Sequence, residues 1–306
     1  MNINYINPLS GAWGRMKKAL FHPFDISKWF VVGFTAFLAG LTDWHKGGGD
    51  NKGGGRGRFD WDDFFHFPGE AWEWLIDNPG WFMLIVFGLV FLILFIVLLI
   101  WLSSRGKFMF LDNVVHDRAQ VIKPWHGFKK IGNSLFLWRL CFGFLCFVLF
   151  MSFLVFCFSV LYYLDESYAP HQMRVLAIVG MALFFLMMVI ITAFIASFLN
   201  DFVVPIMYKH NKRTNQAWSR FLPLFSRYFL YFIFYGFIVF LLHILMIICV
   251  ILIVIFTCCV SVIFLIIPYI SSVVTLPILY TFRAFSLEFL GQFGPEFTLF
   301  PKSEDK

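Results

Sequence analysis

The longest uncharged run of this sequence extends from Tyr228 to Phe282 and holds 55 residues without a Lys, Arg, Asp or Glu. A single helix of that length would be about 80 Å long, whereas the hydrocarbon core of a bilayer is about 30 Å thick. The run therefore predicts a hairpin that crosses a membrane twice. We expect its turn near Thr257 to Cys259, and Pro268 to Ser272 is the alternative position.

The composition supports a protein with several membrane spans. The chain is 60% hydrophobic, 21% aromatic and only 14% charged, which is too apolar for the surface of a soluble domain. We interpret the 44 Phe and 11 Trp residues as lipid-facing and interfacial bulk. The first 25 residues have no long apolar core and no small-residue cleavage site, so we expect Met1 to begin the mature chain.

Six apolar runs predict an all-α polytopic bundle of six transmembrane helices within one domain, residues 1–306. The runs are Ile26 to Thr42, Trp81 to Ser103, Ser134 to Leu164, Val175 to Phe198, Tyr228 to Phe256, and Val260 to Phe282. The first run is short and the third is long, so tilt or protruding ends are expected there. After the second, fourth and sixth runs the apolar pattern continues before charge resumes, which predicts helices that extend past the membrane and pack together.

Basic residues next to the runs predict the orientation. They gather before the first run and in the second and fourth connections, namely Arg15, Lys17, Lys18 and Lys28; Arg105, Lys107, Arg118, Lys123, Lys129 and Lys130; and Lys209, Lys212, Arg213, Arg220 and Arg227. Both termini are therefore expected in the cytoplasm, with the chain in a bacterial inner membrane. The first connection, about Asp43 to Gly80, is long, Gly-rich and net acidic, and we expect it on the far side.

Three segments that precede odd-numbered runs resemble one another. Each has a Trp, a large apolar residue three positions later, and basic residues: Trp13, Arg15, Lys17 and Lys18; Trp125, Lys129 and Lys130; and Trp218 and Arg220. A Gly-Phe pair begins 18 to 20 residues after each Trp, at Gly33, Gly143 and Gly236. We interpret this as a repeat of a basic interfacial helix, a span, an outer turn and a span, with hairpin units 1–113, 114–209 and 210–306. The alternative is that inner-membrane proteins commonly place Trp and Lys before their helices.

These basic Trp segments are candidate sites for lipid. In such a segment the indole lies at headgroup level and the Lys or Arg side chains lie near lipid phosphates. We therefore expect these segments to attract anionic membrane lipids.

The closing segment of the chain carries a resemblance. It runs from Pro277 to Phe300 and includes Arg283, Ser286-Leu287, Phe289-Leu290, Gln292-Phe293-Gly294-Pro295-Glu296 and Leu299-Phe300. It resembles the end of an uncharacterised family of bacterial multi-pass membrane proteins, which shares the Gly-rich first outer loop and the stretch from Ser103 to Asn113. More loosely, the architecture is similar to the membrane domain attached to some glycerophosphodiester phosphodiesterases. The resemblance implies a fold over most of the chain and no site, and it implies none of the phosphodiesterase chemistry.

Four ionisable residues lie in or at the ends of the runs. A charge in the middle of a bilayer costs about 3 kcal/mol on insertion scales, so such residues usually face the protein interior or a wet cavity. We expect Arg139 to reach back to the cytoplasmic interface, and His243 to be a neutral imidazole bonded to a neighbouring helix. Asp201 and Arg283 end the fourth and sixth runs, and we hypothesise an ion pair between them.

Metal and cofactor sites have little support, and we expect no cofactor. Asp60, Asp62, Asp63 and His66 offer ligands for a hard divalent cation, but their spacing matches no known loop, so an acidic rim anchored by aromatic residues is preferred. The six cysteines lie in apolar runs without paired metal-ligand spacing, which favours small buried hydrophobes. Only Cys258 and Cys259 form a vicinal pair that an aqueous turn would make redox-active.

Three functions remain open from sequence. We expect a non-catalytic membrane scaffold or subunit of a larger complex, which binds lipids and either a partner membrane protein or a second copy of itself. The alternative is a transporter or channel for a lipid or small amphiphile. An enzyme is least supported, because the spans hold no cluster of His, Asp and Glu and no nucleophile beside a base. Nothing in the sequence indicates nucleic-acid binding.

Overall fold

The computed structural model describes residues 3–43, 73–166, 170–257 and 267–300, which form helices and no strand within those ranges. The helices are α1 (Ile6–Phe21), α2 (Ile26–Gly40), α4 (Pro79–His116), α5 (Ile122–Gly127), α6 (Lys129–Glu166), α7 (His171–Phe198), the π-helical turn η2 (Leu199–Val203), α8 (Val204–His210), α9 (Thr214–Arg227), α10 (Phe229–Phe256), α12 (Pro268–Val274) and α13 (Leu276–Gly291). The all-helical fold class is therefore confirmed.

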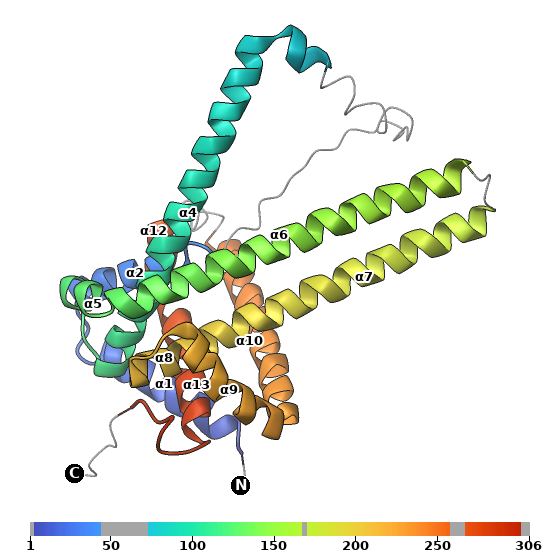
Figure 1. Ribbon diagram of the computed structural model, residues 1–306. Coiled ribbons are helices and arrows are strands. Elements are labelled where there is room, and N and C mark those ends of the chain that lie inside the picture. Colours follow the sequence, from blue (N-terminus) through green and yellow to red (C-terminus); the bar gives the residue numbers. More distant parts are fainter. Residues whose placement is uncertain (1–2, 44–72, 167–169, 258–266, 301–306) are drawn as a thin grey trace.

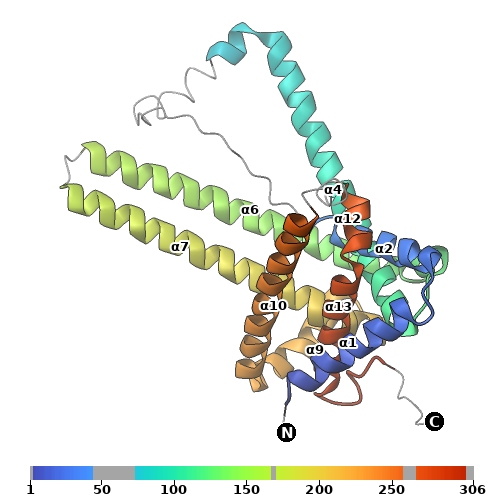
Figure 2. The same ribbon diagram turned by 180° about the vertical axis from the view of Figure 1, so that it is seen from behind.

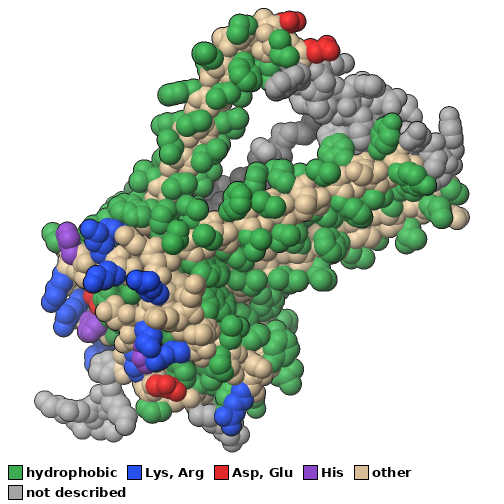
Figure 3. Space-filling view, viewed as in Figure 1, with side chains coloured by type: hydrophobic (Ala, Val, Ile, Leu, Met, Phe, Trp, Pro, Cys, Tyr) green, Lys and Arg blue, Asp and Glu red, His purple; other side chains and the backbone are tan. Residues whose placement is uncertain are grey.

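The molecule consists of a packed base from which long helices extend (Figure 1). We use the word base for α1, η2, α8, α9 and α13 with the residues next to α1 and α13, together with the adjoining ends of α4, α6 and α10. The first half of α4 leaves the base in one direction and the α6–α7 hairpin leaves it in another, as the reverse view also shows (Figure 2). Hydrophobic side chains cover these extensions, whereas Lys and Arg side chains gather over the base (Figure 3).

Aromatic side chains form the centre of the base. Phe202 of η2 stacks on Phe221 of α9, with ring centroids 5.4 Å apart, and lies 4.9 Å from the ring of Tyr235 in α10. Tyr235 in turn stacks on Phe289 of α13 at 4.6 Å. All four side chains are at most 2% exposed. Large rings bury much apolar area each, so this cluster holds together helices that are far apart in sequence.

The two ends of the described chain meet in the base. The backbone N–H of Asn4 donates to Oε1 of Gln292 at 2.9 Å, and the Gln292 amide donates back to the Asn4 carbonyl at 2.8 Å. Ile3 packs against the same core that contains Phe300. Residues near both termini therefore lie on the same side of the molecule.

Four helices are long and apolar enough to cross a membrane: Pro79–His116, Lys129–Leu164, His171–His210 and Phe229–Phe256. The bent pair α12–α13 makes a fifth candidate when it is counted as one span. Helix α2, the first expected span, has only 15 residues, about 22 Å of helix, and is shorter than a bilayer core. The chain thus has the helices of a membrane protein, and six crossings remain a prediction.

Helix α4 continues into the base, as its sequence predicts. Its side chains are exposed as far as the middle of the helix and become buried from Ser103 onward. Gly106 makes this packing possible, because a Cβ at this position would lie 2.6 Å from the carbonyl carbon of Leu38 and 2.7 Å from the backbone N of Ala39. The absence of a side chain therefore allows α2 and α4 to cross in contact.

The close contact of α2 with the end of α4 corrects one sequence assignment. Asp43 was expected to begin the outer connection and Lys107 to belong to the inner one. The Lys107 ammonium instead lies 2.9 Å from the Asp43 carboxylate. Two side chains in contact cannot lie on opposite sides of a core about 30 Å thick, so the assignment to opposite sides is wrong. The cause is that α2 is short and packs beside residues 103–117 of α4 rather than beside its apolar half.

The last apolar run is also not one straight helix. We expected a continuous span from Val260 to Phe282, but α12 and α13 meet at 66° around Thr275. Pro277 explains the break, because it has no N–H to donate to the Val273 carbonyl and its ring collides with that carbonyl in a straight helix. Helix α10 ends at Phe256, next to the position expected for the preceding turn, and residues 258–266 lie outside the described part of the chain.

Candidate functional site

A polar cluster lies where α4, α6, η2, α10 and α13 meet the end of α2. Lys107 is at its centre and its side chain is 5% exposed. The ammonium donates to both carboxylate oxygens of Asp43, at 2.9 and 3.2 Å, and to the side-chain carbonyl of Asn200. All three ammonium protons thus have acceptors, which a buried cation needs.

Arg139 joins the same cluster from α6. Its guanidinium donates to the hydroxyls of Ser103, at 3.1 Å, and Thr42, at 2.5 Å, and lies 3.9 Å from Asp43. The expectation that Arg139 reaches back to the cytoplasmic interface stays a prediction, and the side chain lies where α4 enters the base. The acceptors that α2 and α4 provide hold the side chain inside the protein, where it is 15% exposed.

The π-helical turn positions the contribution of α7. Its first residue, Leu199, accepts a hydrogen bond from the N–H of Val204, five residues later. In a regular α-helix the donor is four residues later. Pro205 provides a cause, since its ring is incompatible with the carbonyl four residues earlier, that of Asp201, in a regular α-helix. The wider turn places Asn200 and Asp201 side by side, facing α4, α10 and α13.

Asp201 and Arg283 come into one region, but not as the direct ion pair that we hypothesised. Arg283 donates to the backbone carbonyl of Asn200 at 2.6 Å, and Asp201 accepts a hydrogen bond of 3.1 Å from the Tyr235 hydroxyl. Within the described residues, no oxygen of Asp201 lies within ion-pair distance of Arg283. The reason is that the π turn presents a carbonyl to the guanidinium while Tyr235 satisfies the carboxylate.

His243 lies on α10, two turns beyond Tyr235. Its Nδ1 is 2.7 Å from the carbonyl oxygen of Val239 in the same helix, and its ring packs on Phe282 of α13 at 4.8 Å. The expected contact with a neighbouring helix is therefore made by the ring face, while this hydrogen bond stays within the helix.

The cluster contains more positive than negative charge. Lys107, Arg139 and Arg283 contribute three cations, and Asp43 and Asp201 contribute two carboxylates. The Nε atom of Arg283 is buried without a hydrogen-bond partner in the described structure. Chemically, such a cluster links six helical elements and is suited to hold an anion or to fix the helix arrangement.

Sequence reasoning named Arg139, Asp201 and Arg283 and missed the central pair. Asp43 was interpreted as a loop acid and Lys107 as a basic flank, because a sequence shows which residues are charged but not which meet. One available signal was the spacing of Ser103 and Lys107, which lie on one face of a helix next to Gly106. Pro205 was the available signal for the π turn.

The first basic Trp segment lies on the outer surface of α1. Trp13 is 48% exposed, and the Lys17 ammonium lies 5.5 Å from the centre of its ring. Lys18 is also exposed. Arg15 instead faces α13, where it forms a 2.6 Å ion pair with Glu288.

The other two Trp segments pack more closely into the protein. Trp125 lies edge-on to Trp101 at 5.7 Å, with the Arg105 guanidinium over both rings, and Trp218 stacks on Trp138 at 5.6 Å. The remaining candidates of these segments, Lys129, Lys130 and Arg220, lie at the surface or partly buried. Of the three Trp residues, Trp13 is therefore the one whose ring is largely free for contact with lipid.

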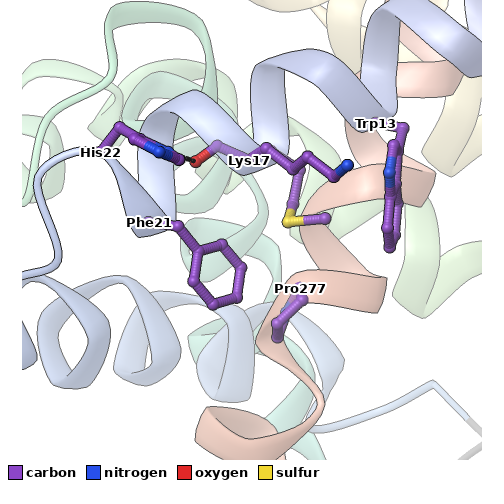
Figure 4. Close-up of a pocket in the computed structure, with 6 residues that line it drawn as sticks. Trp13, Lys17, Phe21, His22 and Pro277 are labelled. Carbon is purple, nitrogen blue, oxygen red and sulfur yellow. Dashed lines mark hydrogen bonds between the residues drawn. The ribbon is translucent and has the colours of Figure 1, made fainter.

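An open groove of about 470 Å³ lies beside Trp13, between α1 and the first turn of α13. Figure 4 shows the Phe21 ring extending from α1 toward Pro277 and the Lys17 side chain extending along α1 toward Trp13. The walls of the groove are formed by Trp13, Met16, Lys17, Phe21, His22 and Pro277. Most of this lining is apolar, and the Lys17 ammonium is at its edge.

The weak metal candidates Asp60, Asp62, Asp63 and His66, and the vicinal Cys258 and Cys259, lie outside the described residues. Among the residues that are described, no group of three or more His, Cys, Asp or Glu side chains is placed to hold a metal ion. Cys141, Cys146, Cys157 and Cys249 are free thiols on the spans.

Comparison with known proteins identifies a family and no activity. Neither the curated proteins nor the solved structures include a match. A family model matches residues 3–268, so the segment Pro277 to Phe300, which carried the resemblance in the sequence, lies beyond the match. The match extends over most of the chain, which therefore belongs to the family of unknown function DUF7544.

Proposed function

We propose that this protein is a non-catalytic scaffold or subunit of a larger membrane complex, which binds lipids and partner membrane helices. The observation that supports this is the exposure of its spans. In each of the four long helices, none of the 18 residues of the most apolar window is buried by the rest of the chain.

Membrane helices associate through close van der Waals packing of complementary faces. Here the close packing is in the base, and the first half of α4 diverges from the α6–α7 hairpin (Figures 1 and 2). Long apolar faces such as those around Phe87 on α4 and Leu176 on α7, 74% and 73% exposed, are thus available to lipid and to other helices. A second copy of the chain or a different membrane protein would supply those helices.

Photo-cross-linking in native membranes tests this function. A photoreactive amino acid in place of Phe87 should capture a membrane protein or a second copy of the chain. The matched control is the same substitution at Phe108, which lies on the same helix and is 0% exposed. Capture of lipid alone at Phe87, together with a monomer after extraction in mild detergent, would contradict the scaffold function.

We also propose six crossings in three hairpin units, with both termini in the cytoplasm of a bacterial inner membrane. The positions of four residues support an even number of crossings. Asn4, Val114, Phe221 and Gln292 all belong to the base. If α4 and α10 each cross once and the base lies on one side, the segments before α4 and after α10 must each cross an odd number of times.

The contacts of two glycines in the proposed repeat are compatible with such units. Gly33 of α2 lies against Val273 of α12, and Gly236 of α10 lies against the ring of Phe194 in α7. In both cases the first apolar run of a proposed unit meets the second apolar run of another unit. The basic surface of the base supports a cytoplasmic location for it.

Cysteine labelling of intact cells checks the topology. In a background without native cysteines, a cysteine at Asp77, just before α4, should react with an impermeant reagent from outside, and one at Lys302 only after the cells are opened. Labelling of both positions from the same side would contradict six crossings.

The polar cluster favours one second candidate, a transporter for a lipid or small amphiphile. Arg139, still 15% exposed, lies in the cluster at the foot of the diverging α4 and α6. A passage between these helices would bring an anionic headgroup to a cationic site. Movement of fluorescent lipid across proteoliposomes that depends on Arg139, and is lost in Arg139→Gln, would favour transport over the scaffold.

A further inference from the structure

We propose that the groove between α1 and α13 binds one anionic phospholipid of the inner leaflet, with its phosphate at Lys17 and an acyl chain along Phe21 and Pro277. This inference rests on the proposed membrane function and specifies where within the protein a lipid is held.

The shape and lining of the groove suit a lipid chain. Its volume of about 470 Å³ is within the range of about 300–1,000 Å³ typical of small-molecule sites. Met16, which is 1% exposed, forms a buried part of the wall, and the Phe21 ring faces Pro277 across the opening (Figure 4). Trp13, Lys17 and Phe21 are spaced four residues apart, so they lie on one face of α1.

The charge at the edge of the groove suits a phosphate. Two other cations of the region have carboxylate partners: Arg15 pairs with Glu288 at 2.6 Å, and Lys28 pairs with Asp117 at 2.8 Å. In the part of the chain that the structure describes, the Lys17 ammonium has no carboxylate within ion-pair distance and lies over the Trp13 ring. It is therefore available for a charge-assisted hydrogen bond to a phosphate oxygen.

The surroundings of the groove are those of a membrane interface. The apolar surface continues from Phe21 to Phe24, Ile26 and Phe30, which are 58%, 61% and 45% exposed. Aromatic side chains next to Lys are typical of helices that lie at headgroup level. A soluble phosphate would leave these apolar walls in water, whereas a phospholipid covers the walls and neutralises Lys17 together.

The experiment measures lipid bound to the purified full chain in detergent, by native mass spectrometry after exchange into phosphatidylglycerol. Lys17→Gln and Lys18→Gln remove the same charge from adjacent exposed positions of α1, but only Lys17 lines the groove. We expect Lys17→Gln to lower the affinity for phosphatidylglycerol by about fivefold, the effect of one Lys near a phosphate. Lys18→Gln and the charge-preserving Lys17→Arg should retain the lipid.

Four outcomes would overturn the proposal. Equal losses of phosphatidylglycerol affinity in Lys17→Gln and Lys18→Gln would indicate diffuse attraction to the basic surface. Unchanged binding in Lys17→Gln would show that Lys17 does not hold the phosphate. Equal binding of phosphatidylcholine would show that charge does not select the lipid. Displacement of the lipid by inorganic phosphate would show that the site takes a soluble anion. The assay needs no partner protein, so its failure is distinguishable from failure of the scaffold function.

Discussion

The ion pair of Asp43 and Lys107 provides the sharpest test of the polar cluster. Asp43→Asn keeps the shape of the side chain and removes its charge, which leaves three cations in the cluster with Asp201 as the one remaining carboxylate. Loss of one partner of a buried pair costs about 3–5 kcal/mol, because the other charge stays buried without compensation. The Lys107 side chain is only 5% exposed, whereas Asp43 keeps 34%, so water screens part of the interaction. We therefore expect the lower end of that range, about 3 kcal/mol.

Thermal unfolding of the purified protein in detergent measures this loss. A change of about 3 kcal/mol corresponds to a decrease in Tm of roughly 5–10 °C for a chain of this size. Adding Lys107→Met to Asp43→Asn should restore at least half of the lost stability, because Met fills similar volume without a charge.

The matched control is Asp117→Asn. Asp117 also forms an ion pair, 2.8 Å from Lys28, but its side chain is 52% exposed. Asn tolerates the left-handed backbone at this position, where φ is 52°. We expect a loss of less than about 1 kcal/mol, as for other exposed pairs. If Asp43→Asn unfolds no earlier than this control, the cluster does not hold the helices together and the reasoning is refuted.

Two further predictions use the same unfolding assay. Gly106→Ala should destabilise by about 1–3 kcal/mol, since its Cβ would meet the backbone of α2, whereas Gly143→Ala, with no described atom within 4 Å, should be neutral or slightly stabilising; equal effects would refute the close crossing of α2 and α4. Tyr235→Phe removes the hydrogen bond to Asp201 from a side chain that is 2% exposed and should cost about 2 kcal/mol; an unchanged Tm would show that the Asp201 carboxylate has another partner.

The class of the protein was accessible from sequence because it depends on patterns along the chain. A run as long and apolar as that from Tyr228 to Phe282 is stable as helix in a bilayer and has few alternatives there. The same holds for the extension of α4 past its apolar half, which Phe108 to Leu111 indicate by staying apolar until Asp112.

What the tertiary structure alone decided is which distant residues meet. Asp43 and Lys107 are 64 positions apart, and their contact depends on the length of α2 and on the close crossing at Gly106. Arg139 turns inward because Thr42 and Ser103 lie within its reach, and Arg283 bonds a carbonyl because a π turn presents one. Hydropathy and charge are properties of single residues and their neighbours in sequence, so they determine the kind of helix. The partner of a buried charge depends on helix crossing and register, which are set by packing in three dimensions.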